Sequence, residues 1–166
     1  MTALNYSIRP AALTDVPFLW DMLYQTIYVP ADATPLSRGI LNHSEISRYV
    51  LGWGQLHDTS LVAVDRESSQ PIGAARFRLL VGEHRGYGYV DDRTPELSTA
   101  VVPEYRGRGV RTSLLSQLLT AAQVHYPAVS LSVSLDNPAL RLYQRLGFEG
   151  VRMCGTSLTM LRRWNP

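Results

Sequence analysis

Lysine is absent from this chain of 166 residues, and all sixteen basic residues are arginines. A P-loop of the form Gly-x-x-x-x-Gly-Lys-Ser/Thr is therefore excluded, because that motif holds phosphate with its lysine. Cysteine is nearly absent: Cys154 stands alone, so an intrachain disulfide is excluded and a reducing compartment is permitted. We interpret Cys154 as a free structural thiol.

Long apolar runs and long basic runs are absent as well. No stretch approaches the ~18 consecutive apolar residues of a membrane span, and the first seven residues lack the basic and apolar regions of a signal peptide. The net charge is only +2, without a basic cluster of the kind that binds nucleic acid. Histidine occurs four times, with no metal-ligand spacing. We therefore expect a cytoplasmic protein with no metal and with neither nucleic acid nor membrane as a partner.

The length and the 45% hydrophobic content suit one globular domain over residues 1–166. In the first half of the chain, the residue pattern predicts a strand at 6–9, a helix after Asp15 and an irregular segment at 29–42. A short helix at 44–51 and a hairpin of strands at 61–64 and 72–80 are predicted to follow. Thr14 or Asp15 can cap the first helix, and Pro17 suits its first turn. The segment at 29–42 suits a wall or lid over a pocket, and the glycine-rich loop at 81–95 suits either substrate contacts or a plain exposed turn.

The second half has clearer periodicity. Strands at 97–102 and 129–135 enclose a helix that starts near Val110 and places its leucines on one face. Strand, helix and strand in this order form a βαβ unit, which predicts a right-handed parallel crossover. Asn137 and Pro138 are typical of the start of another helix, Gly147 is typical of its end, and a final hairpin follows at 148–153 and 158–161.

The turn that joins the first of these strands to the helix has a composition typical of an anion site. Gly107 and Gly109 let the backbone bend and approach a ligand, while the helix start offers unpaired amides and a positive dipole end. Arg106, Arg108 and Arg111 would repel one another and the dipole, so they favour an anion between them. A solvated turn whose arginines reach into water is the alternative.

A Rossmann dinucleotide site is another interpretation of this turn. Residues 107–112, Gly-Arg-Gly-Val-Arg-Thr, match Gly-x-Gly-x-x-Gly except at the last position, and Asp136 follows the next strand, where a ribose-binding acid lies in that fold. Only 57 residues follow Gly109, too few for the second mononucleotide-binding half, and Asp136 directly precedes a helix start, where an acidic residue is common. Both facts weigh against a dinucleotide.

Two segments carry a family resemblance. Residues 101–110 read Val-Val-Pro-Glu-Tyr-Arg-Gly-Arg-Gly-Val, and residues 136–148 read Asp-Asn-Pro-Ala-Leu-Arg-Leu-Tyr-Gln-Arg-Leu-Gly-Phe. At this spacing the two resemble the GCN5-related N-acetyltransferase (GNAT) superfamily, and the order of elements agrees with it over nearly the whole chain. The first segment resembles the acetyl-CoA signature Gln/Arg-x-x-Gly-x-Gly/Ala, filled by Arg106, Gly109 and, in the last place, Arg111. Arg111 is a departure, which either changes the approach of the helix to the pyrophosphate or adds a charge to it.

The resemblance implies the acyl-CoA N-acyltransferase fold, an α+β (α/β) arrangement: a mixed, mostly antiparallel central sheet with a parallel βαβ unit, splayed strands and flanking helices. It also implies acetyl-CoA as acyl-donor co-substrate, bound where the strands at 97–102 and 129–135 separate. The implied contacts are Thr99, Ala100 and Val101 for the pantetheine, and Arg106, Gly107, Arg108, Gly109, Val110, Arg111 and Thr112 for the pyrophosphate. Asn137 is a further pantetheine contact, which its role as a helix cap does not exclude.

In this family the acceptor amine attacks the thioester directly, which calls for a proton acceptor and for a proton donor to the leaving thiolate. Tyr143 matches the family's tyrosine near the sulfur and is the candidate acid; simple packing toward the core is its alternative role. Glu96 begins the central strand and is the candidate base, directly or through water. An exposed carboxylate with no catalytic role is the alternative for Glu96, and the substitute bases are Glu83, His84, Asp91 and Asp92.

The sequence thus predicts an acetyl-CoA-dependent N-acetyltransferase that acts on a primary amine of a small molecule or peptide. The alternative is a catalytically silent acyl-CoA-binding sensor or interaction module with the same fold. Acceptor determinants are expected around 29–56 and 81–95, and the aromatic and acidic candidates there are Tyr28, Trp53, Tyr87, Tyr89, Asp91 and Asp92. A homodimer is compatible with the sequence, which contains no feature that sets the oligomeric state.

Overall fold

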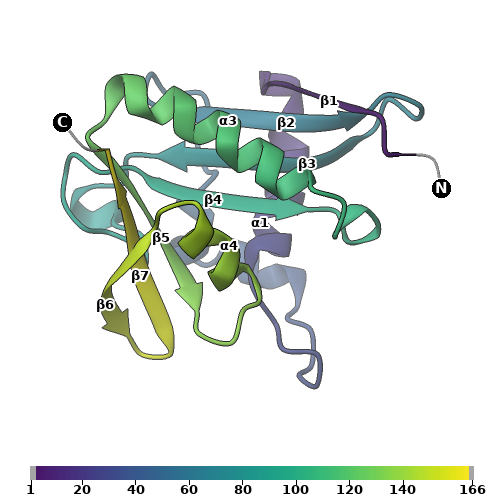
Figure 1. Ribbon diagram of the computed structural model, residues 1–166. Helices are drawn as coiled ribbons and strands as arrows, with labels where there is room; N and C mark the ends of the chain where they lie inside the picture. The colour runs from purple at the N-terminus through teal and green to yellow at the C-terminus, as the bar shows by residue number, and fades with distance from the viewer. Residues whose placement is uncertain (1–2, 165–166) are drawn as a thin grey trace.

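Strand-forming residues alternate with turn residues along the chain, and the computed structural model, which describes residues 3–164, arranges the strands in one mixed sheet. The strands are β1 (Tyr6–Pro10), β2 (Thr59–Asp65), β3 (Pro71–Arg78), β4 (Glu96–Val101), β5 (Ala128–Ser134), β6 (Glu149–Cys154) and β7 (Ser157–Arg163). The helices are α1 (Val16–Thr26), α2 (Ser44–Ser47), α3 (Val110–His125) and α4 (Ala139–Arg145), with 3₁₀ turns at Leu13–Asp15, Arg38–Asn42, Gly82–His84 and Pro103–Tyr105. Across the sheet the strand order is β1-β2-β3-β4-β5-β7-β6 (Figure 1).

Neighbouring strands of this sheet are antiparallel, with β4 and β5 as the parallel exception. The connection between these two strands is α3, so they form the βαβ unit that the sequence predicts. Their ladder contains one registered pair, Glu96 with Ser130, near the start of both strands. Beyond this pair the strands diverge. The predicted fold class, a mostly antiparallel mixed sheet with a splayed parallel pair, is therefore confirmed.

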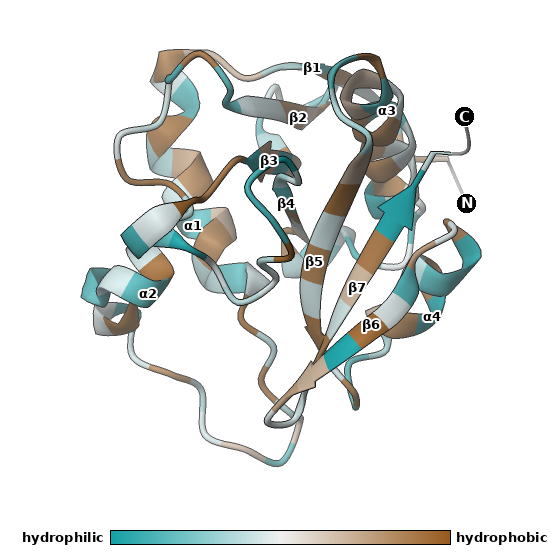
Figure 2. Ribbon diagram, turned by 90° about the vertical axis from the view of Figure 1, so that its left-hand side faces the viewer, coloured by the Kyte–Doolittle hydropathy of each residue, from teal (hydrophilic) through white to brown (hydrophobic). Residues whose placement is uncertain are grey.

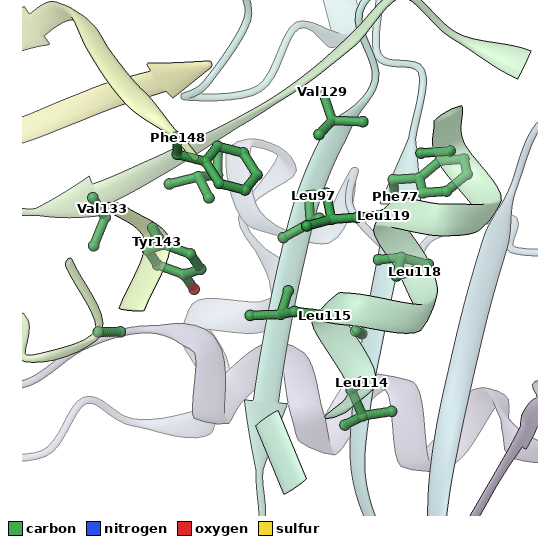
Figure 3. Packing of buried hydrophobic residues seen from close by; sticks show 14 of the residues in the cluster. Phe77, Leu97, Leu114, Leu115, Leu118, Leu119, Val129, Val133, Tyr143 and Phe148 are labelled. Carbon is green, nitrogen blue, oxygen red and sulfur yellow. The ribbon is translucent and has the colours of Figure 1, made fainter. Parts of the chain in front are cut away.

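The periodic leucines of α3 decide how this helix covers the sheet. Leu114, Leu115 and Leu118 lie on one side of the helix and are fully buried. Burial of such a side chain stabilises a fold by about 1.5–3 kcal/mol relative to exposure. Figure 3 shows these leucines beside Phe77 of β3 and Leu97 of β4, within the same apolar cluster. The face of the sheet under α3 therefore carries the main core.

The opposite face of the sheet is covered by α1 and by the segment that follows α2. Leu19 and Met22 of α1 pack with Val50, and the small side chains of Ala74 and Ala100 lie beneath them on β3 and β4. Figure 2 shows α1 and α2 on one side of the strands, with α3 and α4 on the other. Within residues 3–164, no helix is long and apolar enough to cross a membrane.

Both ends of α4 follow from local sequence. The side chain of Asn137 accepts a hydrogen bond from the Ala139 amide at 2.9 Å, as an N-cap residue does. Gly147 has a φ of +90°, and the Phe148 amide donates to the Tyr143 carbonyl at 3.0 Å, which closes the helix with the left-handed C-cap that glycine favours. The predicted limits of this helix are therefore confirmed.

Two local predictions need correction. The Asp15 side chain does not cap α1: its carboxylate accepts from the Ala12 amide at 2.7 Å and pairs with Arg9 at 2.7 Å, which stabilises a 3₁₀ turn before the helix. The helix expected over 44–51 is limited to Ser44–Ser47 and is followed by turns. Helix nucleation is costly, and this single turn has no side-chain cap to stabilise its start, so the helix does not extend further.

Candidate functional site

A cleft opens where β4 and β5 diverge. Its larger part, of about 470 Å³, lies between the two strands and is lined by Arg106 and Arg111; we call it the cationic cavity. A second part, of about 310 Å³, is lined by Tyr28, Tyr49 and Tyr87; we call it the tyrosine cavity. The two cavities share the lining residues Thr26, Ile27, Tyr28, Leu97, Ser98 and Ser132. The two cavities are therefore adjacent and differ in chemistry.

The irregular segment after α1 forms a wall of the cationic cavity. Val29, Pro35 and Leu36 line it. Tyr24 of α1 donates a hydrogen bond to the Leu36 carbonyl at 2.5 Å, which ties this segment to the helix. In Figure 2 the segment runs as a long excursion below α1 and α2. Its position agrees with the wall predicted for residues 29–42.

The cationic cavity lies beside the start of α3. Gly107 and Gly109 have φ values of +76° and +82°, a region that residues with a Cβ rarely adopt, so this turn depends on glycine. The first hydrogen bond of α3 runs from the Ser113 amide to the Gly109 carbonyl at 3.1 Å. The three amides before Ser113 have no acceptor inside the helix. Such amides, together with the helix dipole, form a natural anion site.

Two arginines of this turn line the cationic cavity. Arg106 donates to the Val101 carbonyl at 3.1 Å and to the Gln25 side chain at 3.0 Å, which fixes it at the cavity wall. Arg111 lines the cavity from the first turn of α3, and its Nε is buried without a hydrogen-bond partner within residues 3–164. Burial and, next, the Arg111 charge lower the pKa of Arg106. Two cations thus face a cavity that no acidic side chain of residues 3–164 lines.

Arg108, the third arginine of this turn, does not line the cationic cavity. Its guanidinium lies 5.7 Å from the centroid of the Tyr105 ring, outside the lining of the cavity. Tyr105 in turn donates to the Asp65 carboxylate at 2.7 Å, which anchors the aromatic ring to the end of β2. The structure therefore brings Arg106 and Arg111 together in the cleft and leaves Arg108 on the surface.

One edge of β4 is free beside the cleft. Ala100 and Val101 pair with β3, whereas the ladder toward β5 stops at Glu96. From Leu97 onward, the backbone groups that point toward β5 lack a strand partner, so they are open to a ligand. The Thr99 side chain donates to the Ala74 carbonyl at 3.2 Å and borders the cationic cavity. The side chains of Ala100 and Val101 are buried in the two cores, neither residue lines the cleft, and the Val101 carbonyl already accepts from Arg106.

Tyr143 lies on α4 and borders the cationic cavity. Its ring packs edge-on against Phe148 with 5.9 Å between centroids, and only 8% of the residue is exposed (Figure 3). Burial raises the pKa of the phenol, and the charge of Arg111 partly opposes this shift. The phenol therefore keeps its proton at neutral pH. Tyr143 therefore packs in the core and also borders the cleft, so the two roles do not exclude each other.

Glu96 is the one acidic side chain, among the described residues, that lines the cleft. It borders the tyrosine cavity with 3% of its surface exposed, so the interpretation of an exposed carboxylate is wrong. Its Oε1 accepts from the Gly88 amide at 2.6 Å and from the Tyr49 hydroxyl at 3.1 Å. Burial raises the pKa of Glu96, and the hydrogen bonds from Gly88 and Tyr49 oppose the shift.

The other acid–base candidates lie outside the cleft lining. Glu83 and His84 are exposed in a 3₁₀ turn. Asp91 and Asp92 bind within their own loop, where they accept from the Thr94 and Tyr89 hydroxyls. Trp53 and Tyr89 are each covered by an arginine, and Cys154 is exposed at the end of β6. Of the predicted acceptor residues, the structure places Tyr28 and Tyr87 in the cleft.

Tyr49 is a lining residue that the sequence does not single out. It follows Ile46 and precedes Val50 in a pattern typical of a core-facing helix, which gives no signal of a polar role. Its hydroxyl reaches Glu96 only because β4, 47 residues further along the chain, lies beside it. Serines complete the tyrosine cavity: Ser98, Ser132, Ser134 and Ser157.

Comparisons with known proteins agree with this geometry. An uncharacterised protein of Mycobacterium leprae (strain TN) is 34% identical over 136 residues, which cover 74% of this chain and 37% of that protein. The chain thus spans little more than a third of that relative's length.

Solved structures share the fold. A GCN5-related N-acetyltransferase from Kribbella flavida matches with a TM-score of 0.65 and 21% identity, over 96% of this chain and 98% of that chain. The PaiA N-acetyltransferase from Thermoplasma acidophilum, solved in complex with coenzyme A, matches with a TM-score of 0.63 and 18% identity, over 97% of this chain and 100% of that chain. At these identities the likeness concerns the fold.

A sequence model of the acetyltransferase (GNAT) family matches residues 23–148. That span includes the glycine turn, both diverging strands and α4, so it contains most of the cleft described above. The motif resemblance, the fold and this match agree with one another: the chain belongs to the GNAT family of acetyltransferases.

Proposed function

We propose that this chain transfers an acetyl group from acetyl-CoA to a primary amine, by direct attack of the amine in a ternary complex. The observation that carries the proposal is the adjacency of two unlike cavities that share lining residues. Cations and free amides at one end suit a phosphate-bearing acyl donor, and a single buried carboxylate at the other suits an amine that must lose a proton. The cavities meet at Leu97, Ser98 and Ser132, where the two substrates would come together.

The residues of the cationic cavity fit acetyl-CoA. Arg106, Arg111 and the amides at 107–112 would bind the pyrophosphate, whose charge would offset the repulsion between the two arginines. The free edge of β4 at 99–101 would pair with the pantetheine. Asn137 borders the same cavity while it caps α4, so it can contribute to both. Acetyl-CoA supplies the activated thioester.

Two proton transfers are assigned to the chain's own side chains. Glu96 receives the proton that the amine loses as its nitrogen bonds to the acyl carbon, directly or through water. Tyr143 gives its phenolic proton to the sulfur as the carbon–sulfur bond breaks. The raised pKa of Glu96 makes its carboxylate a better proton acceptor, and Tyr143 is protonated at neutral pH and so carries the proton that it donates.

The tyrosine cavity favours an acceptor with a single basic centre. One ammonium group would find Glu96 as its anionic partner, whereas a second one inside the cavity would lose its hydration without a counter-charge. The faces of Tyr28, Tyr49 and Tyr87 suit an apolar or aromatic body attached to that amine. We therefore place monoamines ahead of polyamines as the acceptor class.

Thiol release from acetyl-CoA, measured with a panel of monoamines, polyamines and peptide amines, tests the function. Calorimetry of CoA binding is measured on the same protein. We expect CoA binding and turnover on at least one monoamine. Binding without turnover on any acceptor would favour the acyl-CoA-binding module, and failure to bind CoA would contradict both functions.

Replacement of Tyr143 by Phe is expected to lower kcat about 10- to 100-fold while the Kd for CoA changes less than about twofold, because the hydroxyl acts only on the leaving sulfur. Steady-state kinetics and calorimetry measure the two effects. Tyr126→Phe is the matched control, since Tyr126 also packs edge-on against a phenylalanine but lies outside the cleft lining. An unchanged kcat in Tyr143→Phe would remove Tyr143 from the mechanism.

Replacement of Arg111 by Ala restores a residue that the family signature prefers, and we expect it to weaken CoA binding about 10-fold. The reason is the loss of a charge-assisted contact to the pyrophosphate, worth about 1.4 kcal/mol at that ratio. Calorimetry at two salt concentrations should also show a smaller salt dependence. Arg108→Ala should have a smaller effect, because Arg108 lies over Tyr105. Tighter binding in Arg111→Ala would show that the side chain obstructs the donor.

A further inference from the structure

The backbone of the loop at 85–89 is held by side chains from the segment after α2 and from β4, β5 and β6. Arg48 donates to the Arg85 carbonyl, Tyr49 accepts from the Tyr87 amide at 2.8 Å, Glu96 accepts from the Gly88 amide at 2.6 Å, Ser130 donates to the Gly88 carbonyl at 2.6 Å, and Arg152 donates to the Tyr89 carbonyl. A segment whose composition suits an exposed turn is therefore built into the edge of the tyrosine cavity.

Two glycines allow this loop to lie against Glu96. A Cβ at Gly86 would overlap both Oε2 of Glu96 and the hydroxyl of Tyr49. A Cβ at Gly88 would come within 2.9 Å of Oε1 of Glu96 and within 2.8 Å of the Leu131 carbonyl carbon. Neither glycine has a positive φ, so the requirement here is close approach and not an unusual backbone conformation.

The Tyr49 hydroxyl bridges this loop and the carboxylate. It accepts from the Tyr87 amide and donates to Oε1 of Glu96, at 2.8 and 3.1 Å. Oε1 therefore receives two donors, from Tyr49 and from Gly88. Oε2 is buried against Gly86, whose backbone also lowers the pKa of Glu96. Both oxygens of the carboxylate therefore lie against the loop.

We propose that Tyr49 is a positioning residue for Glu96: its hydroxyl ties the carboxylate to the 85–89 loop and so fixes the orientation in which Glu96 receives the proton of the acceptor amine. This inference rests on the proposed function, in which Glu96 is the base. It assigns Tyr49 and the loop backbone to the catalytic geometry, although neither needs to contact the donor. The amine's proton ends on the Glu96 carboxylate, the lone pair of the nitrogen forms the new carbon–nitrogen bond, and the carbon–sulfur bond breaks as described above.

Several charged and titratable groups surround Glu96. Tyr49 and Arg48 follow α2, Tyr87 lies on the loop, and Arg78 and Arg76 lie on β3, opposite Glu96 and Ser98 in the register. Arg78 pairs with Asp58 at 2.9 Å, and the guanidinium of Arg76 is buried without hydrogen bonds to described residues. The Tyr49 hydroxyl is the side-chain donor bonded to Glu96, so its removal breaks this contact together with the one from the Tyr87 amide.

The test is the pH dependence of kcat/KM in Tyr49→Phe, which keeps the ring and removes the hydroxyl. A hydrogen bond to the ionised carboxylate lowers the pKa of Glu96, so its loss should move the acidic limb of the profile to higher pH. We expect kcat to fall about 10-fold at neutral pH, with the KM for acetyl-CoA unchanged. Tyr6→Phe, which loses the hydrogen bond to Ser113 outside the lining of both cavities, should match the wild type.

The same substitution in a Glu96→Gln background separates positioning from structural damage. If Tyr49 acts through Glu96, adding Tyr49→Phe to Glu96→Gln should lower the residual rate of that variant little further. An equal 10-fold loss in both backgrounds would overturn the inference. So would an acidic limb of the pH profile that does not move in Tyr49→Phe. A ¹³C NMR titration of the glutamate carboxyls, with Glu96→Gln for assignment, gives a readout that needs no turnover. An unchanged Glu96 titration in Tyr49→Phe would also overturn it, whereas absence of wild-type turnover would instead contradict the proposed function.

Discussion

Replacement of Glu96 by Gln is expected to lower kcat by about 10²–10³, because a positioned base contributes roughly that factor to a proton-transfer step. Glutamine keeps an oxygen that can accept from the Gly88 amide, so the loop and the cleft should retain their shape. The Kd for CoA should therefore stay within about twofold of the wild type. Steady-state kinetics over the amine panel and calorimetry with CoA measure the two quantities.

The pH profile of the wild type adds a sharper expectation for Glu96. The base works as the carboxylate, and burial raises its pKa, so activity should fall as the pH drops through a value above the ordinary glutamate range. Glu83→Gln is the control, since Glu83 is an exposed carboxylate of the neighbouring loop. If Glu83→Gln lost activity while Glu96→Gln retained it, the assignment of the base would be wrong.

Replacement of Gly109 by Trp is expected to abolish CoA binding, with affinity reduced more than about 100-fold. A Cβ at Gly109 meets no atom within 4 Å, so an indole would extend into the open space beside the first amides of α3 and exclude the phosphate. The φ of +82° adds a backbone strain of about 1–3 kcal/mol for any residue with a Cβ. Calorimetry with CoA, alongside thermal unfolding, tests this expectation.

A matched control separates the lost phosphate site from backbone strain. Gly155 in the turn between β6 and β7 also has a positive φ, +60°, a Cβ there would meet no atom within 4 Å, and the residue lies outside the cleft lining. Gly155→Trp should lose some thermal stability and keep CoA affinity. Retained CoA binding in Gly109→Trp would show that the phosphates do not lie at this turn.

Much of the fold could be predicted because its signals are local. The leucine spacing of α3, the Asn137 cap and the Gly147 C-cap depend on residues within one or two turns of each other, and the structure contains all three. The prediction of a helix over 44–51 was wrong in its length, because the pattern of that segment does not by itself decide how far the helix extends. Val50 is buried and Ile46 and Tyr49 pack in the same cluster, but Leu51 is exposed, so the apolar residues do not share one helical face.

The candidate site, too, could be predicted from the sequence only in part. The motif identified the glycine turn and the cations beside it, yet it could not show that Arg106 and Arg111 border the cavity while Arg108 covers Tyr105. Glu96 was found from its position at the start of a strand. Its burial, its raised pKa and its bond to Tyr49 depend on segments that approach from elsewhere in the chain, which no local pattern reports.

The sequence by itself determined the βαβ unit, the glycine turn and the family, because backbone conformation at glycines, helix caps and apolar periodicity are set by neighbouring residues. The tertiary structure decided which side chains share the cleft. The divergence of β4 from β5 opens it, and the approach of the loop at 85–89 places Glu96 in a buried, hydrogen-bonded setting. Desolvation and hydrogen bonding across distant segments control protonation, so the acid–base chemistry of this site arises only in the folded chain.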